Sequence, residues 1–168
     1  MKPMQIIELE GDWNADTAKR TRISCRGLVM KEDKLLLSYE TKTGLWMIPG
    51  GGLEEGETDV DCCVREVGEE TGVLVRPTAC VLELRESFWE FRSASRYFTA
   101  EVIGTSEAKR TEREEKAGME PRWITLEEAL EAFSGECTGC PYPERLWRGL
   151  YKREYAALKA WQEMRDAE

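Results

Sequence analysis

The chain has 168 residues, of which 41% are apolar, and this length and composition suit one folded domain with a sizeable core. Its formal net charge is -9, and much of that charge is local, because residues 50 to 73 carry eight acids and one base. The composition argues against a generally acidic or disordered protein, and also against a nucleic-acid polymer as partner. No histidine is present, which leaves carboxylates as the expected proton-transfer groups.

The N-terminal residues show no charged head followed by a long apolar run, and no stretch approaches 18 apolar residues. We therefore expect a cytoplasmic protein with no membrane partner. Six cysteines are present, and without an export signal they are expected to be reduced thiols and not a disulfide framework.

The predicted elements begin with a short edge strand over residues 4–9. Residues 23–29 and 34–39 are β-rich runs with the sequence KED between them, which is the pattern of a hairpin. The second run is apolar almost throughout, so it is expected to lie in the middle of a sheet.

Three glycines, Gly50 to Gly52, follow Pro49. One interpretation is a flexible loop; the other is a turn whose bare backbone approaches a metal ion or a phosphate closely. The helical pattern that follows favours the second interpretation. This helix is predicted to begin near Glu57 and Thr58 and to end at Gly72, which is suited to a left-handed C-terminal position.

Glu66, Glu69 and Glu70 stand at i, i+3 and i+4, so a helix places their carboxylates on one face. Like charges at this spacing repel, and a hard divalent cation such as Mg²⁺ or Mn²⁺ would relieve the repulsion while leaving water positions for a phosphate substrate. Arg65 lies eight residues beyond Glu57 and is expected to tie the loop to the helix through an ion pair.

The stretch matches the Nudix box G-x5-E-x7-R-E-U-x-E-E-x-G-U, in which U is a bulky aliphatic residue, without a gap or a mismatch. The matching residues are Gly51, Glu57, Arg65, Glu66, Val67, Glu69, Glu70, Gly72 and Val73. The chain thus resembles the Nudix hydrolase (MutT-like) superfamily.

The resemblance implies an α/β fold, an α/β/α sandwich around a mixed sheet in which the box forms a loop, a helix and a loop. It also implies hydrolysis of a nucleoside diphosphate linked to another group, with Mg²⁺ or Mn²⁺ as cofactor and a nucleotide as substrate. By position, Glu66, Glu69, Glu70 and the carbonyl of Gly50 resemble metal ligands. The catalytic set implied by the resemblance is Glu69, Glu70, Arg65 and Glu57.

After the box, residues 73–83 are predicted as a strand interrupted near Pro77, and residues 96–102 as a second strand. The aromatic residues between them belong either to a hairpin core or to a nucleotide site, where Trp89 or Phe91 would stack on a base. Many relatives carry a basic residue just after the strand that reads LLLS here, whereas this chain has Tyr39 and Glu40.

Residues 104–118 form a mixed charge run, which is either a surface loop or the source of the catalytic base. In several Nudix enzymes a glutamate from the corresponding loop activates water. Glu115 is the first candidate, with Glu112, Glu114 and Glu120 behind it.

Thr125 and Glu128 form a capping box before a helix with Leu126, Ala129, Leu130 and Phe133 as its buried stripe. Cys137 and Cys140 make one C-x-x-C, which is half a zinc site and is read mainly as an ordinary reduced loop. Residues 143–166 are predicted as an amphipathic C-terminal helix that packs on the domain or on a second subunit. We expect a single domain over residues 1–168 with its core in residues 20–135.

The predicted function is metal-dependent hydrolysis of a phosphoanhydride bond in a substrate such as a nucleoside triphosphate or a modified nucleotide. Alternatives are a non-catalytic nucleotide-sensing module and a thiol-based C-x-x-C protein. An isopentenyl diphosphate isomerase shares the fold, but the absence of histidine counts against it. Dimers are frequent in the family, so a homodimer stays an option.

Overall fold

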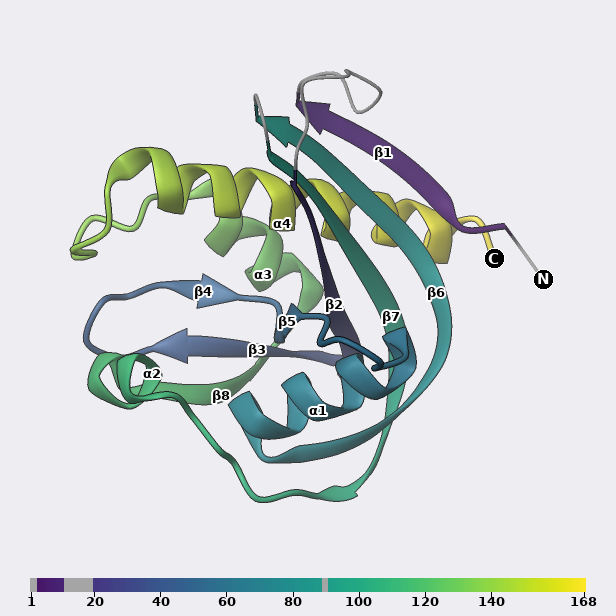
Figure 1. The fold of residues 1–168 in the computed structure, drawn as a ribbon, viewed down its shortest axis with the longest axis horizontal. Coiled ribbons are helices and arrows are strands. Elements are labelled where there is room, and N and C mark those ends of the chain that lie inside the picture. Colours follow the sequence, from purple (N-terminus) through teal and green to yellow (C-terminus); the bar gives the residue numbers. More distant parts are fainter. Residues whose placement is uncertain (1–2, 11–19, 89–90) are drawn as a thin grey trace.

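A computed structural model of the protein describes residues 3–10, 20–88 and 91–168 (Figure 1). Within these ranges the elements follow in the order β1 (Gln5–Glu10), β2 (Arg20–Lys31), β3 (Lys34–Glu40), β4 (Trp46–Met47), β5 (Gly50–Gly52), α1 (Asp59–Thr71), β6 (Val73–Phe88), β7 (Phe91–Thr105), α2 (Glu112–Ala117), β8 (Met119–Ile124), α3 (Leu126–Ser134) and α4 (Glu144–Asp166).

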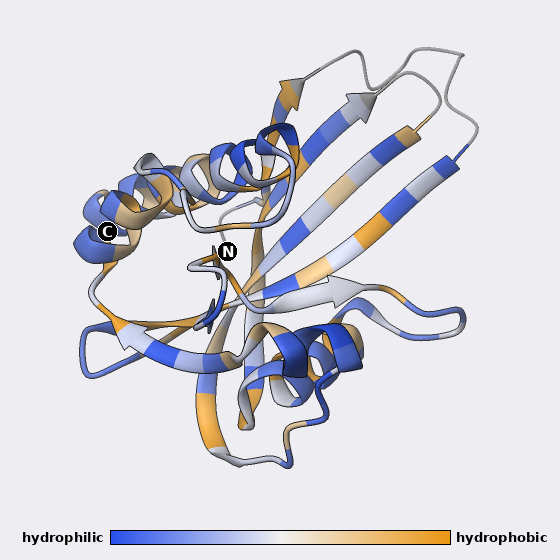
Figure 2. Ribbon diagram, turned by 90° about the vertical axis from the view of Figure 1, so that its left-hand side faces the viewer, coloured by the Kyte–Doolittle hydropathy of each residue, from blue (hydrophilic) through white to orange (hydrophobic). Residues whose placement is uncertain are grey.

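The strands form one mixed sheet in the order β1-β6-β7-β2-β3-β4, with β5 paired to β2 and β8 paired to β3. β1 runs parallel to β6 and β2 runs parallel to β7, while β6 and β7, and β3 and β8, are antiparallel. Blue and orange bands alternate along the long strands in Figure 2, as expected of strands whose two faces differ in polarity. With helices on both faces, this is the predicted α/β/α sandwich.

One face of the sheet is covered by α1. Cys25 and Val29 of β2 pack there against Cys63 and Val67 of the helix. Between them stands Gly27, where an added Cβ would lie 2.8 Å from Val67 Cγ2. The glycine thus lets α1 lie directly on β2, which fixes the helix against the strand that also pairs with β5.

The other face carries α3 and α4. Leu28, Leu35, Leu37 and Tyr97 of the sheet form one buried cluster with residues of both helices. In α3 the capping box between Thr125 and Glu128 is present, and Ala129 and Phe133 of the predicted stripe are buried, with Leu126 and Leu130 packed partly buried against the cluster.

The two longest strands differ from the prediction. β6 runs unbroken from Val73 to Phe88, so the expected interruption near Pro77 is wrong. The register against β7 shifts between Pro77 and Ala79, and such an irregularity accommodates a residue that has no N–H to donate without ending the strand. β7 likewise extends past the predicted residues 96–102 to Phe91 and Thr105.

The charge run after β7 contains a short helix, α2, that was not predicted. Thr111 accepts a hydrogen bond from the Glu114 backbone, and the Glu114 side chain accepts one from the Thr111 backbone, so a capping box starts this helix. Gly118, in the left-handed conformation at φ 72°, ends it.

All six cysteines are free in the structure, and the Cys137 thiol donates to the Thr43 carbonyl at 3.3 Å. The final helix starts directly after Pro143 and buries Trp147, Tyr151, Leu158 and Trp161. No helix in the described ranges is both long enough and apolar enough to cross a membrane.

Candidate active site

The loop before α1 owes its path to glycines. At Gly51 an added Cβ would lie less than 3.0 Å from the carboxylate of Glu66, and at Gly50 it would meet the backbone of Cys25 and Arg26 as closely. The Gly50 N–H points to Glu70 Oε2 at 3.4 Å. Bare backbone is therefore needed where the loop lies between β2 and the carboxylates of α1.

Helix α1 begins and ends as the sequence predicts. Thr58 caps its N-terminus by accepting a hydrogen bond from the Asp61 N–H at 3.1 Å, and Gly72 ends it in the left-handed conformation at φ 75°. Because Cys63 and Val67 face the sheet, the helix turns Glu66 and Glu69 toward the glycine loop and the solvent.

Arg65 ties this loop to the helix. Its Nε donates to Glu57 Oε2 at 2.7 Å and its Nη2 donates to Glu57 Oε1 at 3.0 Å, a bidentate pair, while Nη2 also reaches the Gly52 carbonyl at 3.1 Å. The hydrogen bond from Arg65 lowers the pKa of Glu57 to about 2. The ion pair expected from the spacing of these two residues is therefore present.

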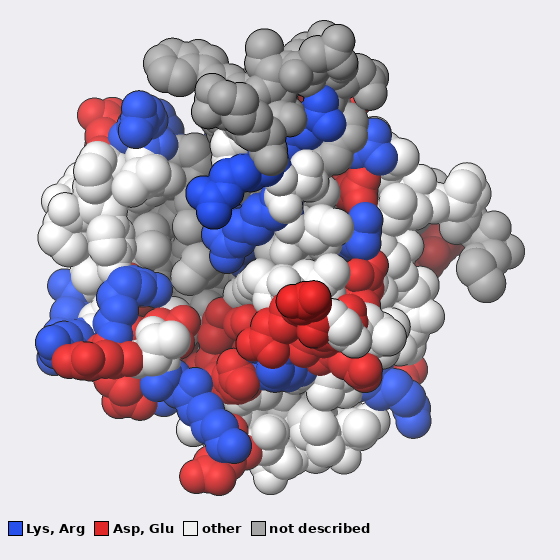
Figure 3. All heavy atoms as spheres, viewed as in Figure 1, with Lys and Arg blue, Asp and Glu red and all other residues white. Residues whose placement is uncertain are grey.

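The three box carboxylates have different surroundings. Glu70 is buried, and this burial raises its pKa well above the usual range, with Arg26 opposing the shift and Glu66 adding to it. Burial also raises the pKa of Glu66, although Arg65 Nη1 lies 2.8 Å from Glu66 Oε1. Glu69 Oε2 is 3.3 Å from the same Nη1. Figure 3 shows acidic side chains gathered on this part of the surface.

These groups fit a hard divalent cation by their chemistry. Carboxylate and carbonyl oxygens are the ligands that Mg²⁺ and Mn²⁺ prefer, and two of the carboxylates are desolvated without enough positive charge beside them. Across the part of the chain that the structure describes, no three acidic or cysteine side chains converge as a closed metal cage. Arg65 instead occupies the space between Glu66 and Glu69.

Helix α2 places its glutamates differently. Glu114 is half-buried and its carboxylate contributes to the raised pKa of both Glu66 and Glu70, so it lies close to the carboxylate cluster. Glu115 is exposed and is not among the main causes of either shift. Burial and this electrostatic effect therefore favour Glu114 over Glu115 as the acid that α2 brings to the site, although Glu114 Oε1 also accepts the Thr111 N–H at 2.9 Å in the capping box.

The aromatic candidates are only partly placed. Trp89 lies outside the described residues. Phe91 is the first residue of β7, is 38% exposed and pairs in register with Arg20 of β2.

The position where many relatives carry a base is taken up by structural contacts. Glu40 is buried, accepts a hydrogen bond from Thr43 Oγ1 at 2.7 Å and pairs with Arg113 of α2 at 3.1 Å. Tyr39 stacks at a tilt on Trp46, with 4.3 Å between ring centroids, and the Arg122 guanidinium lies 4.6 Å from its ring.

Two supporting residues were not predicted. Arg26 and Glu154 fix the backbone of Ile48 on both sides of its Cα. Arg26 Nη1 donates to the Ile48 carbonyl at 3.1 Å, and Glu154 Oε2 accepts from the Ile48 N–H at 2.8 Å. The Gly27 N–H binds the next carbonyl, that of Pro49, at 2.9 Å. The segment leading to Gly50 is thus fixed by β2 and by α4. A signal existed, since Glu154 is a lone acid on the apolar stripe of the final helix.

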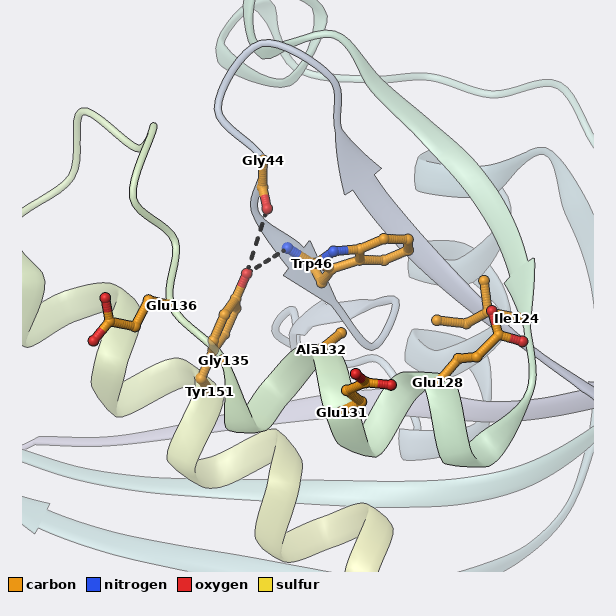
Figure 4. A pocket seen from close by; sticks show the side chains of 9 residues that line it. All are labelled: Gly44, Trp46, Ile124, Glu128, Glu131, Ala132, Gly135, Glu136 and Tyr151. Carbon is orange, nitrogen blue, oxygen red and sulfur yellow. Dashed lines mark hydrogen bonds between the residues drawn. The ribbon is translucent and has the colours of Figure 1, made fainter.

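A separate cavity of about 430 Å³ lies between β4, α3 and α4 (Figure 4). Trp46, Glu128 and Glu131 border it, and the Tyr151 hydroxyl closes one side by accepting a hydrogen bond from the Trp46 N–H at 3.1 Å. No box residue lines this cavity, so it is distinct from the carboxylate cluster.

Residues 20–137 match the family model of the NUDIX domain, and the chain therefore belongs to the NUDIX family. It is a Nudix hydrolase by its fold, its complete box and its relatives. The family generally hydrolyses pyrophosphate bonds in nucleoside diphosphate derivatives.

Among the curated relatives, the MutT-like protein of Streptomyces ambofaciens is 32% identical over 113 residues, which cover 67% of this chain and 69% of that protein. Nudix hydrolase 12, mitochondrial, of Arabidopsis thaliana is 35% identical over 112 residues, which cover 61% of this chain and 53% of that protein. The match thus spans about half the length of the plant relative.

Two solved structures share the fold. The Escherichia coli ORF135 protein aligns with a TM-score of 0.62 at 20% identity, covering 89% of this chain and 94% of that one. The MutT protein from Methanosarcina mazei Go1 aligns with a TM-score of 0.58 at 19% identity, covering 89% of this chain and 99% of that one. These likenesses support the architecture.

Proposed function

We propose that the chain hydrolyses a phosphoanhydride bond in a nucleoside diphosphate linked to another group, with Mg²⁺ or Mn²⁺ bound at the box. The observation that carries the proposal is the carboxylate cluster on α1. Glu66 and Glu70 are partly or fully desolvated, their pKa values are raised, and the glycine loop lies directly against them. Such a cluster is stabilised by a bound cation and is unfavourable without one.

The metal ligands in this proposal are Glu66, Glu69, Glu70 and the carbonyl of Gly50. A bound divalent cation would supply Lewis acidity toward the phosphate oxygens, on which negative charge grows in the transition state. Arg65 and Glu57 keep the loop at its distance from α1, so they position the ligands and do not touch the reacting atoms.

For the proton, we propose Glu114 as general base. A water oxygen bonds to one phosphorus of the anhydride as the bridging P–O bond breaks, and a proton of that water passes to the carboxylate. Two phosphate-bearing products leave. The half-buried position of Glu114 beside Glu66 and Glu70 supports this role over exposed Glu115.

The first test follows release of the two phosphorylated products, separated by chromatography, from a panel of nucleoside triphosphates, dinucleoside polyphosphates and nucleotide sugars, with and without Mg²⁺. We expect metal-dependent release by the wild-type protein and a loss of at least about 100-fold in Glu70→Gln, since removing a catalytic charge stabiliser costs that much or more. Glu55→Gln is the matched control, because Glu55 is exposed in the same loop and is not a box position. A panel that stays silent while nucleotide still binds would favour the nucleotide-sensing module.

The base is tested by comparing Glu114→Gln with its neighbour Glu115→Gln. We expect the first to lower kcat by roughly 10²- to 10⁴-fold, the range for general base catalysis. Glu115→Gln should retain activity. The reverse ranking would assign the role to Glu115.

A further inference from the structure

The first half of β2 carries arginines at alternate positions. Arg20, Arg22 and Arg26 are separated by even numbers of residues, so their side chains leave the strand on the same face. Cys25 and Val29 have odd numbers, so they point to the other face of the strand, where they contact α1. The arginines therefore line the opposite face, the one that α4 covers further along the strand.

Arg22 lies next to the box. Its Nε and Nη2 would each be 3.6 Å from a Cβ added to Gly52, and the neighbouring Gly51 touches the carboxylate of Glu66. Figure 3 shows a group of basic side chains above the acidic cluster on the same face of the molecule. Opposite charges thus meet at the glycine loop, with the metal-binding side on α1 and a basic side on β2.

Two of these arginines have no charged partner among the described residues. Arg20 and Arg22 are exposed, and neither forms a hydrogen bond or an ion pair with another residue of the described ranges. By contrast, Arg96 on β7 is held between Asp59 and Glu83. Arg26 is buried, and within the described residues its Nε has no hydrogen-bond partner although its Nη1 binds the Ile48 carbonyl.

The neighbouring strand keeps this face polar. Ser93 stands in register with Arg22, and the hydroxyl of Ser95 lies 3.2 Å from that of Ser24. Guanidinium and hydroxyl groups on one face of the sheet can donate hydrogen bonds to phosphate oxygens. An uncharged base or sugar bound there would leave the arginines without a counter-charge.

We propose that Arg20 and Arg22 form a subsite for phosphate groups of the substrate that lie beyond the scissile anhydride. The proposal rests on the function proposed above and names its substrate class: compounds in which the group linked to the nucleoside diphosphate is itself phosphorylated. Arg22 binds the phosphate nearest the box. Arg20, roughly 6.6 Å further along the strand, binds the next.

The test compares two substrates that share an anhydride and differ in phosphate number, namely diadenosine tetraphosphate and ADP-ribose. Charged hydrogen bonds support a loss of roughly 10- to 100-fold in kcat/KM for the tetraphosphate in Arg22→Gln. ADP-ribose hydrolysis should change little, and Arg22→Lys should recover part of the loss. Lys31→Gln is the matched control, since Lys31 is exposed on the same strand roughly 30 Å away, far beyond a Debye length.

A second measurement works without turnover. Isothermal titration of Glu114→Gln protein, which keeps the proposed metal ligands, with inorganic tripolyphosphate and with pyrophosphate, each with Mg²⁺, should show at least tenfold weaker tripolyphosphate binding once Arg22→Gln is added, with pyrophosphate binding unchanged. That binding result supports the subsite even if no substrate is hydrolysed. A lack of hydrolysis would count against the proposed function and not against the subsite. An equal loss of kcat/KM for both substrates, or of affinity for both anions, would place Arg22 on the scissile anhydride. No loss for either would show that Arg22 does not contact the substrate. Each of these outcomes overturns the proposal.

Discussion

Replacing Glu154 by glutamine should destabilise the protein strongly, although the residue lies far from the box in sequence. Its carboxylate is fully buried and accepts hydrogen bonds from the Ile48 N–H at 2.8 Å, the Tyr97 hydroxyl at 2.6 Å and Arg153 Nε at 3.0 Å. Burial opposes its charge, yet the pKa of Glu154 is lowered, because the guanidiniums of Arg153 and Arg26 favour the ionised form.

The size of the effect follows from these partners. Glutamine keeps the shape and one acceptor but leaves two buried guanidiniums without their carboxylate, and breaking a buried pair in this way costs about 3–5 kcal/mol. We take the lower end, about 3 kcal/mol, because one acceptor survives. With an unfolding entropy of roughly 0.35 kcal/mol/K for a chain of this length, the melting temperature should fall by about 8 °C.

Scanning calorimetry at pH 7 measures the shift, and Glu163→Gln is the control because Glu163 is exposed on the same helix. The control should stay within about 2 °C of the wild type. If Glu154→Gln also melted within that interval, the buried carboxylate would not be holding the arginines and the reasoning would fail.

The pH dependence of this difference has a defined sign. A carboxylate with a lowered folded-state pKa stabilises the protein above its unfolded pKa of about 4.3, and this contribution is lost as the pH falls through the folded pKa. The gap in unfolding free energy between wild type and Glu154→Gln should be level from about pH 6 to 8 and shrink below about pH 4. A gap that is still full at about pH 2 would contradict the assignment of the charge.

Three further predictions concern the box and α4. Saturating Mg²⁺, at about 100 times its Kd, should add about 2.7 kcal/mol or roughly 8 °C to the thermal stability of the wild type, and Glu70→Gln should lose most of this gain in calorimetry. Gly51→Ala should weaken the apparent Mg²⁺ affinity by roughly tenfold or more, because the new Cβ pushes against Glu66. Gly52→Ala, whose new Cβ has its nearest contacts at 3.6 Å, should not. Equal Mg²⁺ affinities of the two variants would contradict the close approach at Gly51. Gly149→Ala should raise the melting temperature by about 2 °C, since nothing lies within 4 Å of the new Cβ and glycine weakens a helix interior by about 0.5–1 kcal/mol; a lower melting temperature would show a contact there.

The box itself was predictable because its interactions are local. The Thr58 cap, the Gly72 terminus and the Glu57–Arg65 pair all join residues within a few helical turns, where spacing translates directly into position. Helix α2 could have been found in the same way, because Thr111 and Glu114 carry the capping-box spacing inside what looked like a charge run.

The supporting residues were not predictable from spacing, because their partners lie far away in the chain. Arg26 and Glu154 are 128 positions apart and meet only because α4 packs on the face of the sheet to which Arg26 of β2 points, around Ile48. The choice between Glu114 and Glu115 likewise depends on how α2 is rotated against α1, which neighbouring residues of equal charge do not reveal.

The parallel pairing of β2 with β7 has a consequence for how the molecule forms. Ser24 and Ser95 are partners across 71 positions of chain, so β2, which pairs locally with β3 and β5, gains β7 as its other neighbour only after a long loop has closed. Helix α1, which needs only its own caps and a short stretch of β2, can form sooner. During refolding we expect helical circular dichroism to recover before substrate turnover does, with the interval set by closure of the central pair of strands.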